Sequence, residues 1–200
     1  MKLILLLLPF LISSLQAALL TQAEKDLILS THNNLREQIA NGFAGFPAAD
    51  NMRVLIWDQN LEKRASALAD MGLFAHNPDD FDEDTNSYVG ENLYSIRSSG
   101  TPVLKVDTAI QKWFDEYIYF DSAQIADFEN NGANGQMVGH FTQVVWGSTN
   151  KLGCGKYVTS GRINLVCNYG EAGNFIGEPV YTSGIPCSKC TCVTGRKLCN

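Results

Sequence analysis

Six cysteines that follow an apolar leader constrain the fold of this chain more than any other feature. A basic start at Lys2 is followed by an uncharged, apolar run over residues 3–15 and by the small residues Ala17 and Ala18. This pattern is typical of a secretory signal peptide, and it is shorter than the roughly 20 apolar residues of a membrane helix. We therefore expect residues 1–17 to be removed and the mature protein to be secreted into the oxidising extracellular space.

The cysteines fall into two groups, and both predict disulfides. Cys154 and Cys167 lie at similar distances from a turn at Ser160-Gly161, which joins strands expected at 152–159 and 162–169. They are near enough to opposite positions for a cross-strand disulfide. The C-terminal four can form two more disulfides or a zinc knuckle, and an oxidising compartment favours the disulfides. These four are Cys187, Cys190, Cys192 and Cys199.

Charge and length narrow the range of partners. The chain has 15 Lys and Arg against 21 Asp and Glu, with both signs scattered along it. Nucleic acid binding requires clustered Lys and Arg, so we expect no nucleic acid partner. No segment after the leader predicts a transmembrane helix. A mature chain of this size can bury one sizeable core, so its disulfides are not obligatory for folding.

The first part of the mature chain predicts two helices. Thr21 and Glu24 have the spacing of a capping box, and the helix that they begin is expected to end at Asn41-Gly42. A β-rich run at 54–57 follows. Asp58 can then cap a second helix, whose small residues permit close packing.

The second part of the chain adds strands, a helix and a loop. We expect a short strand at 90–95 and a third helix that opens at Pro102 and runs through Tyr117. The Asn and Gly residues at 130–139 predict an irregular loop. With the hairpin near the C-terminus, these elements indicate an α+β fold.

Four polar residues at element boundaries are candidate site residues. They are His76, Glu91, Glu116 and His140. Imidazole and carboxylate groups can bind a divalent metal such as zinc, or can act as acid and base. The four are dispersed and form no compact metal motif, so spacing alone leaves a shared site open. His32, on the first helix, is more typical of a packed residue. The chain has neither a Gly-x-Ser-x-Gly elbow nor a phosphate-binding loop.

One segment resembles a known family. The run 139–146, Gly-His-Phe-Thr-Gln-Val-Val-Trp, is similar to the most specific motif of the CAP superfamily, which comprises the cysteine-rich secretory, antigen 5 and pathogenesis-related proteins. Further segments agree in order at 32–36, 55–58, 90–94 and 167–175. The resemblance covers roughly residues 21 to 181.

The resemblance implies a fold and a cleft. The fold is a three-layer α-β-α sandwich around a central antiparallel sheet. The family's cleft holds two His and two Glu, which here fall on His76, Glu91, Glu116 and His140. It therefore implies a site for a divalent cation, with Zn2+ best suited to the histidines.

The C-terminal residues resemble the hinge of the cysteine-rich secretory branch, in a shortened form. That hinge implies the pairs Cys187–Cys192 and Cys190–Cys199. We accordingly divide the mature chain into a CAP domain at 21–181 and a cysteine-rich, hinge-like tail at 184–200. The chain departs from the family in lacking a cysteine shortly before His76, so one core disulfide is absent.

Three functions are open for this chain. The leading interpretation is a non-enzymatic, venom allergen-like extracellular effector or binding protein with an unknown protein, lipid or sterol partner. A sterol or lipid export protein is the second, because Phe120, Ile125 and Phe128 partly fit the family's aromatic loop. A metal-dependent hydrolase is the third, with zinc on the histidines and a glutamate as base.

Overall fold

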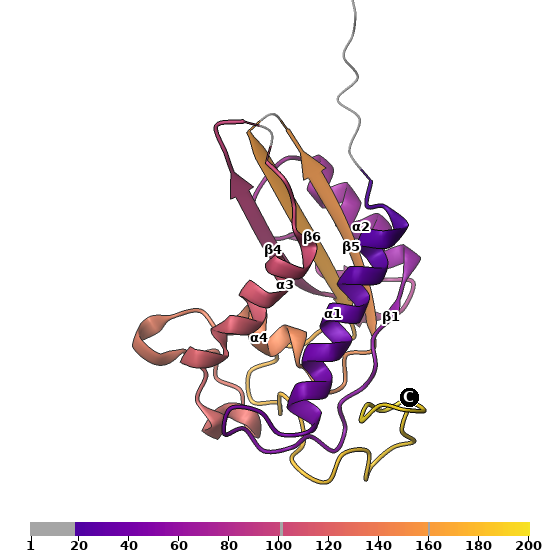
Figure 1. Cartoon of the computed structure of the whole chain (residues 1–200), viewed down its shortest axis with the longest axis vertical. Coiled ribbons are helices and arrows are strands. Elements are labelled where there is room, and N and C mark those ends of the chain that lie inside the picture. Colours follow the sequence, from indigo (N-terminus) through magenta and orange to yellow (C-terminus); the bar gives the residue numbers. More distant parts are fainter. Residues whose placement is uncertain (1–18, 101, 160) are drawn as a thin grey trace, which may run out of the picture.

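The computed structural model in Figure 1 describes residues 19–100, 102–159 and 161–200. The expected signal peptide at 1–17 and Ser160 of the expected hairpin turn lie outside this part of the chain. Within the described part, none of the helices combines the length and the apolar character needed to cross a bilayer.

A four-stranded sheet in the order β1-β5-β6-β4 forms the middle layer. Antiparallel pairing joins β4 to β6 and β5 to β6, which confirms the expected centre of the sheet. The short β1 departs from the expected antiparallel arrangement, because it is parallel to β5, and a long crossover of the chain separates the two strands. The strands are β1 (Ile56–Trp57), β4 (Gly90–Arg97), β5 (Lys151–Val158) and β6 (Arg162–Gly170), and a separate small hairpin contains β2 (Phe81–Asp82) and β3 (Ser87–Tyr88).

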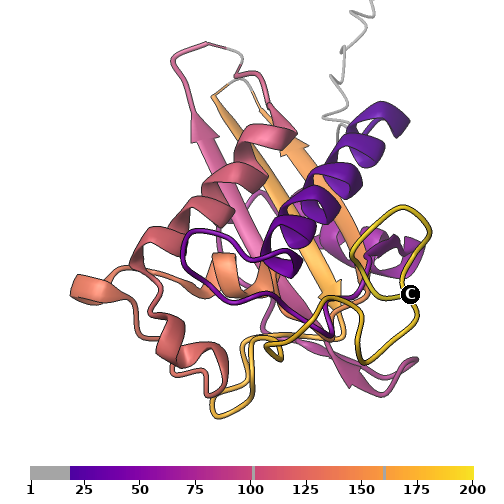
Figure 2. The same cartoon turned by 60° about the horizontal axis from the view of Figure 1, so that its bottom comes forward.

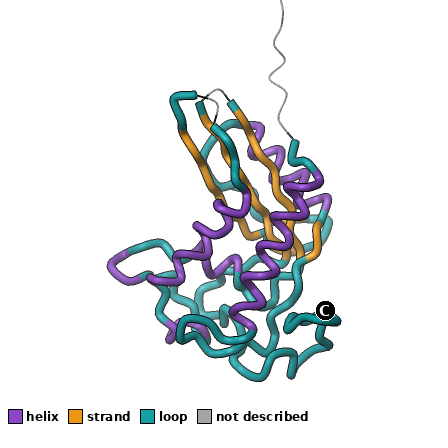
Figure 3. Tube along the Cα trace, in the orientation of Figure 1, coloured by secondary structure: helices purple, strands orange, loops and turns teal. Residues whose placement is uncertain are grey.

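Helices cover both faces of this sheet, so the predicted three-layer sandwich is confirmed (Figures 1 and 2). On one face lie α1 (Gln22–Ala40), α3 (Val106–Phe114) and α4 (Gly139–Val144), and on the other lies α2 (Gln59–Asp70). Long loops gather at one end of the sheet (Figure 3). Short 3-10 helices interrupt them at η1 (Asp115–Tyr119), η2 (Ser122–Ile125) and η3 (Ala133–Gly135).

The ends of the first two helices follow their sequence signals. Thr21 and Glu24 form both hydrogen bonds of the capping box, and α1 ends at its C-cap Asn41. The side chain of Asp58 accepts hydrogen bonds from two backbone N–H groups in the first turn of α2. These caps satisfy N–H groups that have no partner within the helix.

The predicted start of the third helix was wrong. Pro102 precedes the helix, and Lys105 is still extended with φ −102° and ψ 99°, so α3 begins at Val106. Proline can begin a helix because its φ is fixed, but it supplies no cap for the residues that follow. After Phe114 the chain tightens into η1, which carries Glu116 and Tyr117.

Two glycines allow α2 to lie directly on the sheet. A Cβ atom at Gly153 would lie 2.5 Å from the carbonyl carbon of Leu61, and one at Gly155 would lie 2.5 Å from the Cα of Ser66. On the opposite face, the Cys154–Cys167 disulfide joins directly paired residues of β5 and β6 and is buried in the main core. Strand β5 therefore has its glycines on the face that contacts α2 and its disulfide on the face covered by α1, α3 and α4.

The cysteine-rich tail is joined to the rest of the chain by backbone pairing. The N–H of Cys199 donates to the carbonyl of Met52, and the N–H of Val54 donates to the carbonyl of Cys199, both at 2.8 Å. This pairing explains why the β-rich run expected at 54–57 joins the sheet only from Ile56. Leu198 is fully buried in the main core.

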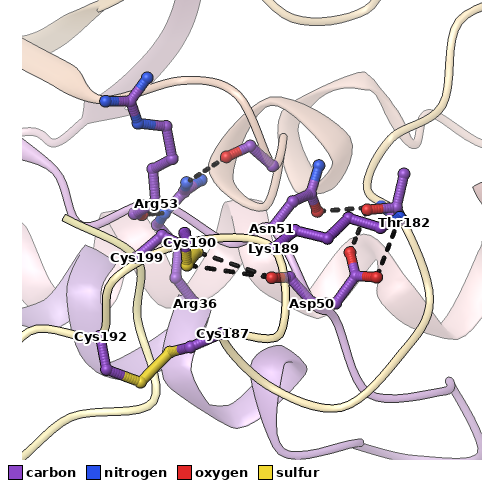
Figure 4. Close-up of a disulfide and its surroundings, with 11 residues drawn as sticks. Arg36, Asp50, Asn51, Arg53, Thr182, Cys187, Lys189, Cys190, Cys192 and Cys199 are labelled. Atoms are coloured by element: carbon purple, nitrogen blue, oxygen red, sulfur yellow. Dashed lines mark hydrogen bonds and ion pairs between the residues drawn. A yellow bond between two sulfur atoms is a disulfide. The ribbon is translucent and has the colours of Figure 1, made fainter.

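The tail's disulfides pair as the hinge resemblance implied, Cys187 with Cys192 and Cys190 with Cys199 (Figure 4). All six cysteines of the chain are therefore in disulfides. Beside the tail, the buried Asp50 carboxylate pairs with the Lys189 ammonium group at 3.0 Å. The tail is thus cross-linked within itself by two disulfides, and it is held against the loop before β1.

Candidate metal-binding cleft

His76 and Glu91 form the first of two histidine–glutamate pairs. His76 follows α2, and its Nδ1 lies 2.9 Å from Glu91 Oε1 at the start of β4. Glu91 also accepts hydrogen bonds from the backbone N–H of Asn77 and from Asn168 Nδ2, at 3.0 and 3.1 Å. The hydrogen bond with Glu91 raises the pKa of the His76 imidazole. The His76 side chain is 67% exposed and that of Glu91 is 8% exposed, so a buried carboxylate orients an accessible imidazole.

His140 and Glu116 form the second pair. His140 Nδ1 lies 2.7 Å from Glu116 Oε1, and both side chains are largely buried. Glu116 Oε2 accepts from the backbone N–H groups of His140 and Phe141, at 3.1 and 3.3 Å. Glu116 therefore caps the N-terminus of α4 from η1, where Val138, the N-cap residue, offers no side-chain hydrogen bond. The rings of Trp113 and His140 are stacked, with their centroids 6.2 Å apart.

The short helix α4 is held in place by side chains far along the sequence. Thr142 Oγ1 donates to Asn174 Oδ1 at 2.6 Å, and Asn174 Nδ2 donates to the Gly139 carbonyl at 2.8 Å. A Cβ atom at Gly90 would collide with the buried side chain of Gln143. The glycine of β4 and the polar residues of α4 therefore fit one another, and together they fix the backbone that carries His140.

Asn92 relates the position of the second pair to that of the first. Its Nδ2 donates to the His140 carbonyl at 3.1 Å and to the Tyr169 hydroxyl at 3.2 Å. Asn92 follows Glu91 in β4, and successive side chains of a strand point to opposite faces of a sheet. The two pairs therefore lie on either side of one edge strand, at the same end of it.

The geometry gives the histidines and the glutamates different roles. Each glutamate engages the Nδ1 of its histidine and so directs the other ring nitrogen, Nε2, away from the pair. Metal-binding histidines commonly have this arrangement, in which a carboxylate fixes the ring. Among the described residues, no three of the four residues bring metal-binding atoms within 4.8 Å of one another. The geometry therefore leaves Nε2 of His76 and Nε2 of His140 as the atoms that could bind a metal, with Glu91 and Glu116 as supports of the two rings.

The cysteines of the tail offer no second metal site. The sulfurs of Cys187, Cys190 and Cys199 lie within 4.8 Å of one another. All three are in disulfides, whereas zinc requires thiolates. The tail is therefore described by its disulfides and not by the zinc-knuckle alternative.

His32 is a buried structural residue, as its place on the first helix indicated. It is fully buried; its Nδ1 lies 2.8 Å from the Ile28 carbonyl and its Nε2 lies 2.9 Å from the Tyr169 hydroxyl. Nδ1 must donate to the carbonyl, and in the neutral ring Nε2 then accepts from the hydroxyl. Burial lowers the pKa of His32 to about 4.

We predict that His32 makes stability depend on pH between 6.5 and 4. The unfolded chain takes up this proton first, so stability from this group is complete above pH 6.5 and is lost as pH falls toward 4, by about 3 kcal/mol in total. An NMR titration should show His32 neutral down to about pH 4 and His76 protonated already above 6.5. A His32 titration midpoint near 6.5 would contradict the buried network.

The residues proposed for a lipid-binding loop lie in the core. Phe120, Ile125 and Phe128 are 7%, 4% and 0% exposed and belong to the main hydrophobic cluster. Phe128 packs edge-on against Trp146 at 5.7 Å. A lipid would have to displace these side chains before it could contact them.

The fold and the two pairs define a class of protein, and comparison with known families agrees. Residues 29–169 match the family model described as CAP, the cysteine-rich secretory protein family. The chain therefore belongs to the CAP family, as its 139–146 motif indicated.

Among known proteins, scoloptoxin SSD552 of Scolopendra dehaani is 37% identical over 182 residues, which cover 88% of this chain and 83% of that protein. Venom allergen 3 of Solenopsis invicta is 37% identical, covering 80% and 73%. The crystal structure of NaASP2 with Zn2+ is 31% identical with a TM-score of 0.71, covering 90% of this chain and 96% of that one.

Sequence reasoning named the four residues of the two pairs and missed those that position them. Asn92 and Asn168 are buried amide residues inside strands, and Asn174 has a positive φ of 63° in a loop. Buried Asn in a strand is uncommon and requires hydrogen-bond partners, which is a signal that the sequence did contain. Their partners lie far along the chain and could not be assigned from it.

Proposed function

We propose that this CAP protein acts outside the cell as a non-enzymatic effector or binding protein whose cleft holds a zinc ion on His76 and His140. The observation that carries the proposal is the paired arrangement, in which each histidine has Nδ1 engaged by a glutamate. The relative NaASP2, whose structure is described with Zn2+, adds support for the ion. The apolar leader and the three disulfides support secretion.

A binding role is favoured over hydrolysis by the engagement of both carboxylates. A general base must reach the proton that it removes. Glu91 accepts three hydrogen bonds from protein donors and Glu116 also accepts three. Carboxylates so occupied are suited to holding histidines and backbone in place. The lipid-export alternative has less support, because the three residues on which it depends are buried.

Zinc binding provides the test of this proposal. Titration calorimetry of the mature, metal-free protein is expected to show about one equivalent of zinc, and the His76→Ala/His140→Ala variant is expected to lose it. Glu91→Gln keeps the size of the side chain but removes the charge behind His76. We expect it to weaken binding by about 10- to 100-fold, as for other residues that support metal ligands.

The matched control is Glu129→Gln, which neutralises an exposed carboxylate on the loop after η2. It should bind zinc as the unmodified protein does. Unchanged binding by the double histidine variant, with a native circular dichroism spectrum, would reject this site. Release of p-nitrophenol from an ester substrate by the zinc-loaded unmodified protein, together with no release by the double histidine variant, would move the proposal to a hydrolase.

A further inference from the structure

A strip beside α2 combines exposed apolar side chains with acidic ones. It follows the chain from the end of α2 to β3, and we call it the docking strip. Its members are Met71, Leu73, Phe74, His76, Asp79, Asp80, Asp82, Glu83, Asp84 and Tyr88.

The apolar end of the strip is held outward by a fixed backbone. Arg162 Nη1 donates to the Gly72 carbonyl at 3.4 Å, and Asn164 Nδ2 donates to the Leu73 carbonyl at 3.3 Å. The side chains of this segment nevertheless face solvent, since Met71 is 65% exposed, Leu73 59% and Phe74 53%. Isolated exposed apolar residues are common, but here three lie within four positions on an anchored loop, where contact with a partner would remove them from water together.

The strip continues along the sheet to the first histidine pair and then to the small hairpin. His76 meets Glu91 in β4, and the N–H of Val89 donates to the Asp80 carbonyl at 2.7 Å. Asn164 and Asn168 of β6, which donate to the Leu73 carbonyl and to Glu91, lie about 13 Å apart along an extended strand. This length suits an extended peptide segment of several residues.

A hollow of about 200 Å³ lies at the middle of the strip. Asn168 is 1% exposed and lines this hollow, and its Oδ1 has no hydrogen-bond partner among the described residues. A buried acceptor without a partner is costly, and a donor from a ligand would satisfy it. Asn168 Nδ2 already donates to Glu91. The atom without a partner is therefore the acceptor Oδ1, which requires a hydrogen-bond donor from the ligand.

The charges around the hollow favour a cationic donor. Asp79, Asp80 and Glu91 line it together with His76, opposed by Arg64, whose Nη1 donates to the Phe81 carbonyl. Arg64 Nη2 lies 4.0 Å from the Asp79 carboxylate and, like Asn168 Oδ1, has no hydrogen-bond partner among the described residues. The acidic groups still outnumber this one cation.

The sequence around the strip is uniformly acidic. Between Arg64 and Arg97 the chain contains no Lys or Arg and seven acidic residues, at positions 70, 79, 80, 82, 83, 84 and 91. An acidic surface repels the anionic headgroups of membranes and attracts basic proteins. The apolar end of the strip therefore points to a protein partner and not to a lipid surface.

We propose that the docking strip binds an extended segment of a second protein in which apolar side chains flank a Lys or Arg. The apolar side chains contact Leu73 and Phe74. The basic side chain enters the hollow, donates to Asn168 Oδ1 and is balanced by Asp79 and Asp80. The hollow shares His76 and Glu91 with the proposed zinc site, and the proposal goes beyond that site by assigning a protein partner. The residues tested below include neither histidine and neither glutamate of the two pairs, so failure of one proposal can be told from failure of the other.

A labelled peptide of alternating leucine and lysine serves as the probe, measured by fluorescence anisotropy against the mature protein. Saturable binding is expected, and a peptide with glutamate in place of lysine should not bind. The variants Asp79→Asn/Asp80→Asn and Leu73→Ser/Phe74→Ser are each expected to weaken binding at least tenfold. Zinc titration of the same variants reports separately on the cleft.

Matched controls make the same chemical changes on the opposite helical layer. Asp107→Asn/Asp115→Asn changes the net charge equally, and Val103→Ser/Ile118→Ser removes two exposed apolar side chains. Each should change the affinity less than twofold. Equal weakening by strip and control variants, or no saturable binding, would overturn the proposal. Strip-dependent binding to vesicles containing phosphatidylserine would overturn it in favour of a lipid surface.

Discussion

Replacing Arg36 with methionine is expected to lower the free energy of unfolding by at least about 4 kcal/mol, because the Arg36 guanidinium is fully buried and joins α1 to two loops. Its five hydrogen bonds have lengths between 2.8 and 3.4 Å, and no carboxylate is among the acceptors. The acceptors are the carbonyl oxygens of Arg53, Val144, Trp146, Gly147 and Thr149.

The size of this effect follows from what methionine leaves behind. Burial lowers the pKa of the Arg36 guanidinium to about 9, so at neutral pH it is still charged. Hydrogen bonds to a charged group are each worth about 1.5 to 3 kcal/mol, and methionine would leave buried carbonyls without a donor. For a chain of this size, the loss corresponds to a melting temperature lower by about 10 to 15 °C.

Urea and thermal unfolding followed by circular dichroism measure this change. The control is Arg97→Met, at an exposed position at the end of β4. It should alter the free energy of unfolding by less than about 0.5 kcal/mol. If Arg36→Met were as stable as the control, the carbonyls would have to find other donors, and the guanidinium would not be what holds these loops to α1.

Alanine at Gly153 and Gly155 is expected to have the second large effect. The added methyl groups would meet backbone atoms of α2, which cannot rotate away as the end of a side chain can. The helix must then move off the sheet, opening the small core that contains Leu68 and Val166. Overpacking commonly costs about 1 to 3 kcal/mol, and backbone collisions place each substitution at or above the upper end of this range.

The double variant Gly153→Ala/Gly155→Ala is expected not to accumulate as folded protein. The yield of soluble protein and the free energy of unfolding of each single variant measure this effect. Gly100→Ala is the control, because a Cβ atom there meets nothing within 4 Å. Single variants as stable as the control would mean that α2 can shift away from β5 at little cost.

Much of the fold was accessible from local sequence, wherever its signal lay within a few residues. The capping box at Thr21, the cap at Asp58 and the hairpin of β5 and β6 were of this kind. Helix α4 was not predicted because its six residues are too short for a periodic pattern, and Glu116 caps it from 24 residues away. Pairing of Val54 with Cys199 likewise depends on tertiary contacts that no local pattern contains.

The candidate site likewise has one part that local sequence indicates and another that depends on tertiary contacts. The residue types of both pairs could be named from sequence and family resemblance, because His76, Glu91, Glu116 and His140 stand at element boundaries. Their pairing, His76 with Glu91 and His140 with Glu116, required the sheet and η1 to bring distant residues together. The supporting role of the glutamates is a property of hydrogen-bond geometry, which composition and spacing do not contain.

The anchoring of the tail has a practical consequence for recombinant work. A gene fragment trimmed to the family match at 29–169 would omit Ile28, Val180 and Leu198, all of which are completely buried. Expressed alone, such a fragment would expose to water the apolar core side chains that these three residues cover, and it would aggregate more readily. Purification tags are better attached through a spacer beyond Asn200, and a protease used to remove them should not recognise the basic Arg196-Lys197 step, which is held against α1 by Glu37.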